Sequence, residues 1–297
     1  MPNECPTSSF DLEKAISRLI AFFDLFEYPL TPWEVWHYLD ERFRLSDIMA
    51  ALDRLAGSGA TAQEAAIGHQ AGFYFLRGRE KTITTRQQRH NYSQRKINIA
   101  KRFGRLFSWL PAVKVVAVAN SLGGYNLRDG SDIDFFIITA AGRIWLSRLF
   151  CTGLAKILNR RPTARHKRDR ICLSFYLADD HLALSELALP GFDPYFHYWQ
   201  RSLIVLYNKD RKYQAFLAAN RLPGGQAAKA VKNSGHLANH WEKMAKRWQL
   251  KIMPVALLSQ NGGTGGVVLG DSIIKLYLSD RRLEFSKKYE EKIQVLA

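Results

Sequence analysis

The sequence has few cysteines and no apolar run long enough to span a bilayer, and both absences exclude classes of protein. Three cysteines stand among the 297 residues, at positions 5, 151 and 172. They lack metal-ligand spacing and are too few for a disulfide framework. The apolar stretch 144–158 is short and contains Arg148 and Lys156. The amino terminus is polar and acidic, unlike a signal peptide. We therefore expect a cytoplasmic protein that does not associate with membranes.

Acidic residues are also scarce, with 27 Asp and Glu against 43 Lys and Arg, which gives a net charge of +16. The charge is uneven: residues 1–85 carry −4, residues 86–172 carry +14 and residues 173–297 carry +6. A positive field attracts nucleoside triphosphates, RNA and DNA. The pattern predicts nucleic-acid contacts in this basic central region, at residues 86–105 and 160–170. The alternative is a solvated basic surface.

The first 82 residues have the element order of a winged helix-turn-helix. Apolar spacing predicts helices over 11–26, 31–40 and 46–56, and residues 67–78 predict a β-hairpin. Thr31 and Glu34 form a capping-box pattern at the start of the second helix. We predict a winged-helix-like domain over 11–82. The negative net charge of residues 1–85 favours a protein partner over DNA, and DNA binding is the alternative.

The rest of the chain divides into three parts, and the whole belongs to the α+β class. Residues 84–110 predict a basic helical connector. Residues 111–190 contain apolar runs typical of strands at 113–119, 135–139 and 170–178, with a helix over 144–158. Residues 191–297 predict a helical C-terminal region, with helices over 193–216, 225–250 and 271–297. The glycine-rich segment 262–266 lacks the Lys-Ser/Thr of a phosphate-binding P-loop and predicts a surface loop.

A Ser-Asp-Ile-Asp motif at residues 131–134 opens the second of these strands. Side chains alternate along a strand, so Asp132 and Asp134 point to the same side. Two carboxylates about 6 Å apart repel each other by about 3 kcal/mol at an effective dielectric constant near 20. A divalent cation would neutralise this repulsion, and Mg²⁺ prefers carboxylate oxygens.

The full pattern resembles the polymerase-β-like nucleotidyltransferase superfamily: a strand, a serine in a glycine-rich turn, then Asp-x-Asp entering a second strand. Here the turn is 120–124. The resemblance implies a nucleotidyltransferase-fold mixed sheet with helices, with Asp132 and Asp134 as catalytic residues and ligands of Mg²⁺. It further implies phosphate contacts from four small residues: Ser121, Gly123, Gly124 and Ser131. The implied reaction is transfer of a nucleoside monophosphate from a nucleoside triphosphate to an unknown acceptor. The order of domains resembles uncharacterised bacterial nucleotidyltransferase-domain proteins.

The family takes a third carboxylate from a later, neighbouring strand, but the run 170–178 contains no acidic residue. Asp179 and Asp180 follow it directly. They are either the third ligand or turn residues, and the turn is the commoner role. Two alternatives therefore stand beside the enzyme. One is a catalytically inactive regulator that binds nucleotide or nucleic acid. The other is a DNA-binding transcription factor with a fused domain.

Overall fold

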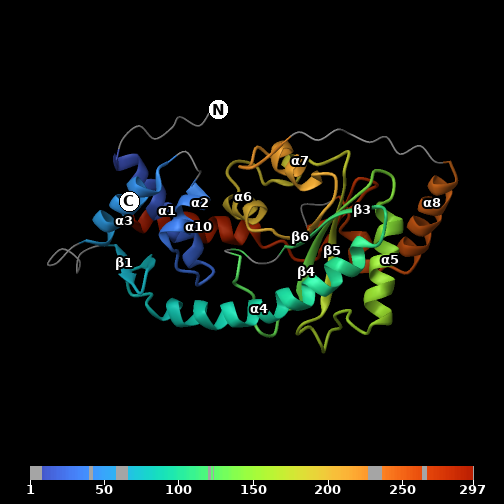
Figure 1. The fold of residues 1–297 in the computed structure, drawn as a ribbon, viewed down its shortest axis with the longest axis horizontal. Coiled ribbons are helices and arrows are strands. Elements are labelled where there is room, and N and C mark those ends of the chain that lie inside the picture. Colours follow the sequence, from blue (N-terminus) through green and yellow to red (C-terminus); the bar gives the residue numbers. More distant parts are fainter. Residues whose placement is uncertain are drawn as a thin grey trace. The chain divides into compact units, whose positions relative to one another are not determined.

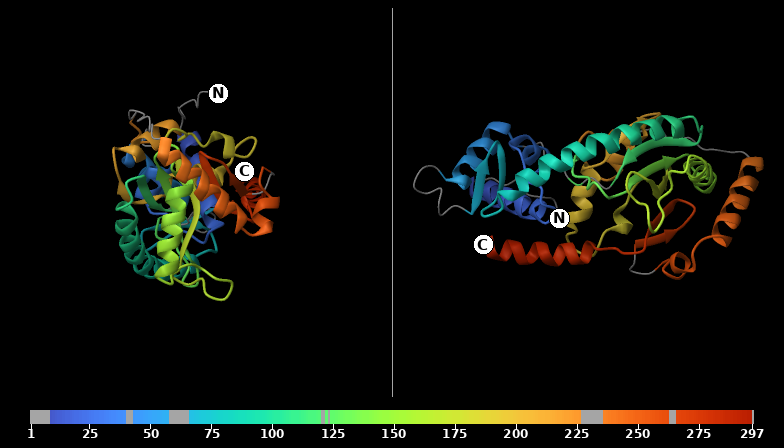
Figure 2. Two further views of the ribbon diagram at one scale, coloured as in Figure 1. Left: turned by 90° about the vertical axis from the view of Figure 1, so that its right-hand side faces the viewer. Right: turned by 90° about the horizontal axis from the view of Figure 1, so that it is seen from below.

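The computed structural model describes residues 9–39, 43–57, 66–119, 122, 124–226, 236–262 and 266–296. The chain divides into two compact units (Figures 1 and 2). Unit 1 comprises Met1–Asn91, Gly191–Arg201 and Arg282–Ala297, and unit 2 comprises Tyr92–Pro190 and Ser202–Arg281. Within the described ranges, no helix combines the length and apolar character needed to cross a membrane.

Unit 1 has the helices and the hairpin that apolar spacing predicts at the amino end. The hairpin turn consists of Ala71 and Gly72, whose φ values of 52° and 77° suit a two-residue turn with the right-handed twist of a hairpin. The capping box is confirmed: the Thr31 amide donates to Glu34 at 2.9 Å, and the Glu34 amide donates to Thr31 Oγ1 at 3.3 Å. The elements are α1 (Ser9–Asp24), α2 (Pro32–Leu39), α3 (Leu45–Ala56), β1 (Ile67–Gln70), β2 (Phe73–Leu76), the start of α4 (Lys81–Ser108), α6 (Pro194–Arg201) and α10 (Arg282–Leu296).

Two segments from the far end of the sequence complete the core of unit 1. Phe22 of α1 is fully buried, and its ring lies 4.7 Å from Tyr198 of α6 and 5.9 Å from Tyr289 of α10. Lys292 of α10 also forms a 2.7 Å ion pair with the buried Asp24. Unit 1 therefore extends beyond the segment 11–82 that its amino-terminal pattern outlines.

Unit 2 is built on a six-stranded mixed sheet of order β6-β3-β4-β5-β8-β7. The pair β4–β5 is parallel and the other pairs are antiparallel. Helix α5 connects the two parallel strands, as a parallel crossover requires. The elements are β3 (Val113–Val118), β4 (Ile133–Thr139), α5 (Ile144–Ile157), β5 (Ile171–Ala178), β6 (Ile204–Asn208), α7 (Lys212–Ala219), α8 (His236–Lys251), α9 (Val255–Ser259), β7 (Gly266–Leu269) and β8 (Ile273–Tyr277).

The structure corrects the prediction that residues 191–297 are a helical region. Strand β6 interrupts the helix predicted over 193–216, and β8 takes the start of the helix predicted over 271–297. Strands β6, β7 and β8 are four or five residues long, so helical spacing in their flanks masks them in the sequence. The conformation of β6 follows from pairing with β3, that of β8 from pairing with β5, and that of β7 from pairing with β8, since strand preference depends strongly on packing context.

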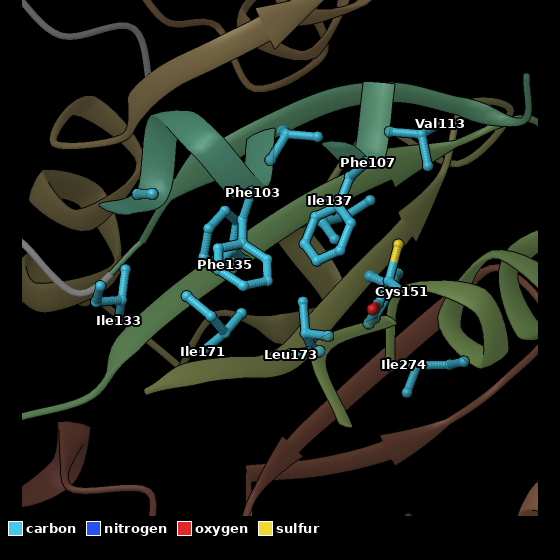
Figure 3. Close-up of a cluster of buried hydrophobic side chains, with 14 of the residues drawn as sticks. Phe103, Phe107, Val113, Ile133, Phe135, Ile137, Cys151, Ile171, Leu173 and Ile274 are labelled. Atoms are coloured by element: carbon cyan, nitrogen blue, oxygen red, sulfur yellow. The ribbon is translucent and has the colours of Figure 1, made fainter. Parts of the chain in front are cut away.

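Helices cover both faces of the sheet. Phe107 of α4 lies 5.8 Å from Phe135 on one face, while Phe216 of α7 lies 5.3 Å from Phe136 on the other. Neighbouring strand residues point to opposite faces, so these contacts place α4 and α7 on opposite sides. Figure 3 shows the α4 face, where Phe103 and Phe107 cover the apolar side chains of β4 and β5.

Candidate metal centre

The parallel pair β4–β5 brings three possible metal ligands together at its amino end. Asp132 directly precedes β4, Asp134 is the second residue of β4, and Cys172 is the second residue of β5. Asp134 and Cys172 are direct partners in the strand register. One ligand atom from each of the three residues lies within 4.8 Å of the other two. All three residues are half-buried.

The electrostatics of this cluster favour a bound cation. Burial, and then the neighbouring charge of Asp132, raise the pKa of Asp134 above its ordinary value. Burial also raises the pKa of the Cys172 thiol, and the two carboxylates raise it further. The thiol is therefore neutral at pH 7 in the absence of metal. The two carboxylates fit Mg²⁺, which takes oxygen ligands, whereas a thiol suits softer metals.

A buried lysine ties together the two loops that lead into β4 and β5. Lys96 of α4 is fully buried; its Nζ donates to the Ser131 carbonyl at 2.6 Å and to Asp169 at 2.9 Å. The Asp169 amide donates to the same Ser131 carbonyl at 3.2 Å, and Arg95 donates to Asp169 at 3.1 Å. These contacts fix the positions from which Asp132 and Cys172 approach each other.

The structure describes two of the four residues predicted to contact phosphate. Ser121 and Gly123 lie outside the described residues. Gly124 has a φ of 87°, a left-handed conformation that favours glycine, and an added Cβ would meet nothing within 4 Å. The Ser131 hydroxyl donates to the Arg128 carbonyl at 3.0 Å, so this side chain stabilises the loop before β4.

Neither Asp179 nor Asp180 joins the cluster; both lie in the turn after β5, the commoner of their two predicted roles. The buried Asp179 accepts from the Ala141 amide at 2.9 Å and pairs with Lys212 at 2.7 Å. Along the strand, Asp179 lies about 23 Å from Cys172, at roughly 3.3 Å per residue.

Cys172 is the site residue that sequence reasoning missed. The cysteine positions show no metal-ligand spacing, because the ligands come from two strands separated by helix α5. In the structure Cys172 takes the same second position in its strand as Asp134 does. The predicted strands begin at 135 and 170, so aligning their starts does not pair these two residues.

Much of the positive charge on α4 is neutralised within the protein. Arg86 donates to both oxygens of Glu34, at 2.8 and 2.9 Å, and Arg89 pairs with Glu27. Arg95 pairs with Asp129 at 2.6 Å. Unit 2 contains several exposed bases within the basic segments 86–105 and 160–170. They include Lys101, Arg102, Arg105, Arg165 and Lys167. A nucleic-acid surface in the central region would therefore use these residues.

Comparison of the chain with protein-family models, with curated proteins and with solved structures finds no match.

Proposed function

We propose that the chain binds a nucleoside triphosphate with Mg²⁺ at Asp132 and Asp134, in a site of the nucleotidyltransferase type. The observation that carries this proposal is the convergence of two half-buried carboxylates at the start of β4. No lysine or arginine is among the causes that shift the pKa of Asp134. Mg²⁺ would neutralise the carboxylates and share its remaining coordination sites with phosphate oxygens.

The reaction of such a site is transfer of a nucleoside monophosphate to an acceptor, with pyrophosphate as the leaving group. Mg²⁺ supplies charge stabilisation for this in-line displacement. In this chain Asp132 and Asp134 would hold the cation. The loop held by Lys96 would keep both carboxylates aligned.

The neutral thiol of Cys172 favours a second candidate, a regulator that binds nucleotide without rapid turnover. By the resemblance, a third carboxylate would come from the strand beside β4, and Cys172 is the β5 residue in register with Asp134. Mg²⁺ prefers oxygen ligands, so a thiol at this position weakens a Mg²⁺ site. We therefore expect Mg²⁺-dependent nucleotide binding together with slow transfer.

Cys172→Asp tests this reasoning, because it supplies a carboxylate at the third position. Pyrophosphate release from the four common nucleoside triphosphates would be measured, with water and with an RNA 3′-hydroxyl as acceptors. We expect near-background release by the parent and faster release by Cys172→Asp. Cys172→Ser is the matched control, since it replaces the sulfur by an oxygen without adding charge. It should release pyrophosphate at the rate of the parent. Rapid release by the parent would instead support the transferase.

For unit 1 we propose a winged-helix-like domain that contacts protein rather than DNA. Arg54 is the one base on α3, and it pairs with Glu13 at 2.6 Å. Arg79, at the end of the hairpin, pairs with the buried Asp24 at 2.8 Å. These pairs weaken the positive surface that a DNA reader needs. Specific duplex binding by the full chain that is lost in Arg54→Ala would contradict this assignment.

A further inference from the structure

Unit 2 contains a pocket of about 390 Å³ whose lining includes neither Asp132 nor Asp134. It lies between helices α5, α8 and α9 and the neighbouring strands β5 and β8 of the sheet. This volume falls within the usual range of small-molecule sites. Three cationic side chains line it, Arg148, Lys156 and Arg161, and none of its described lining residues is acidic.

Arg148 is the unusual feature of this pocket, because it is a buried cation for which the described residues provide no anionic partner. Its side chain belongs to α5, and the residue is only 9% exposed. Among the described residues, its hydrogen-bond partner is the neutral amide oxygen of Gln249, at 2.6 Å, and its Nε has none. The parts of unit 2 that the structure leaves undescribed contain no Asp or Glu in sequence. A buried charge without a counter-charge is costly, so its presence indicates a ligand that supplies one.

A second cation strengthens this argument. Arg161 lies close enough to Arg148 for its charge to contribute, after burial, to lowering the pKa of the Arg148 guanidinium. Arg161 is itself half-buried, and its Nη1 lies 3.4 Å from the Ile171 carbonyl. Two guanidinium groups facing one pocket match a dianion such as phosphate, which they can bind with several charge-assisted hydrogen bonds.

The aromatic and apolar residues that line the pocket indicate the chemistry of the uncharged part of the ligand. Trp248 of α8 lines the pocket and is 53% exposed, so its ring is available for stacking. Apolar residues such as Ile252, Met253 and Leu257 surround the same opening. An aromatic face beside a cationic end suits a flat ring that carries a phosphate group.

We propose that this pocket binds a small phosphate-bearing ligand with a flat body, of the nucleoside monophosphate class. Arg148 and Arg161 would bind the phosphate, and Trp248 would stack on the base. Cys172 lines this pocket and also belongs to the metal centre, whose two carboxylates do not line it. The site needs no metal and does not depend on the function proposed above.

Calorimetric titration of the full chain with AMP in EDTA tests this proposal separately from the metal centre. AMP should bind, and both adenosine and inorganic phosphate should bind more weakly, because each lacks one part of the ligand. Arg148→Met and Arg161→Met should each lower AMP affinity about ten- to a hundredfold, the effect of losing a charge-assisted hydrogen bond. Trp248→Ala should lower it by roughly tenfold, the effect of losing base stacking.

Two neighbouring residues provide matched controls. Arg160→Met removes an exposed base next to Arg161, and Trp241→Ala removes an exposed ring on the same helix as Trp248; neither residue lines the pocket. Both variants should bind AMP like the parent. If Arg148→Met does not fold, the half-buried Arg161 still decides the result. Failure of AMP to bind the parent, equal binding of inorganic phosphate, or unchanged affinity in Arg161→Met would overturn the proposal.

Discussion

Replacing the buried Lys96 with methionine should destabilise unit 2 and displace the metal centre. The change removes two hydrogen bonds from a charged donor, at 2.6 and 2.9 Å, and leaves an apolar side chain of similar length. Such bonds contribute about 1.5–3 kcal/mol each, and breaking a buried ion pair costs about 3–5 kcal/mol. Asp169 is 19% exposed and keeps Arg95, so we expect a smaller loss, of about 2–3 kcal/mol.

Differential scanning calorimetry of the full chain would measure this loss. For a unit of about 150–250 residues, 1 kcal/mol shifts Tm by about 2–4 °C, so Lys96→Met should lower the transition of unit 2 by about 5–10 °C. Lys101→Met on the exposed face of α4 is the matched control and should shift Tm by less than about 2 °C. Equal transitions in the parent and in Lys96→Met would refute the reasoning.

The loss of stability in Lys96→Met should also depend on pH. Burial alone would raise the pKa of Asp169, but hydrogen bonds from Lys96 and Arg95 outweigh burial and hold that pKa below its ordinary value. A lowered carboxyl pKa stabilises the fold above the unfolded value of about 3.9 and ceases to do so as pH falls through the folded pKa. The difference in stability between the parent and Lys96→Met should therefore be largest at neutral pH and shrink below about pH 4.

Two further predictions concern charge. Asp132→Asn and Asp134→Asn should each leave Tm in EDTA unchanged or higher, since they relieve repulsion between carboxylates whose ligand atoms lie within 4.8 Å, about 3.5 kcal/mol at an effective dielectric constant near 20; a lower Tm would show that the carboxylates stabilise the metal-free fold. The double variant Arg165→Glu with Lys167→Glu should weaken single-stranded RNA binding and make it less dependent on salt, because each lost phosphate contact reduces counterion release. Filter binding at several salt concentrations measures the affinity and its salt dependence. Unchanged affinity would contradict a role for residues 160–170.

The sequence predicts most elements that lie in long apolar patterns and misses those that depend on distant partners. Strands β3, β4 and β5 are mostly apolar, and their predicted ranges agree closely with the observed ones. The three short strands of the C-terminal part carry too few residues to show a period of two. Their conformation follows from pairing across the sheet.

In the candidate metal centre, too, the sequence predicts what a local motif contains and misses what distant residues contribute. Asp132 and Asp134 stand in one local motif, so their proximity follows from strand geometry alone. Cys172 reaches them through the parallel register of β5, and Lys96 contacts Asp169 across 73 positions of sequence. Arg86 similarly pairs with Glu34 across 52 positions. Charge counts along the sequence cannot show such pairs, so they overstated the free positive charge on α4.

Titration of the full chain with Mg²⁺ and a non-hydrolysable ATP analogue is the most direct test of the proposed metal centre. Isothermal calorimetry should show nucleotide binding that requires Mg²⁺, and Asp134→Asn should reduce it by at least about tenfold, because it removes a charged metal ligand. Thr139→Val is a suitable control, since it changes a buried residue at the opposite end of the same strand and should leave this binding unchanged. Nucleotide binding of equal affinity in the parent and in Asp134→Asn would contradict the account.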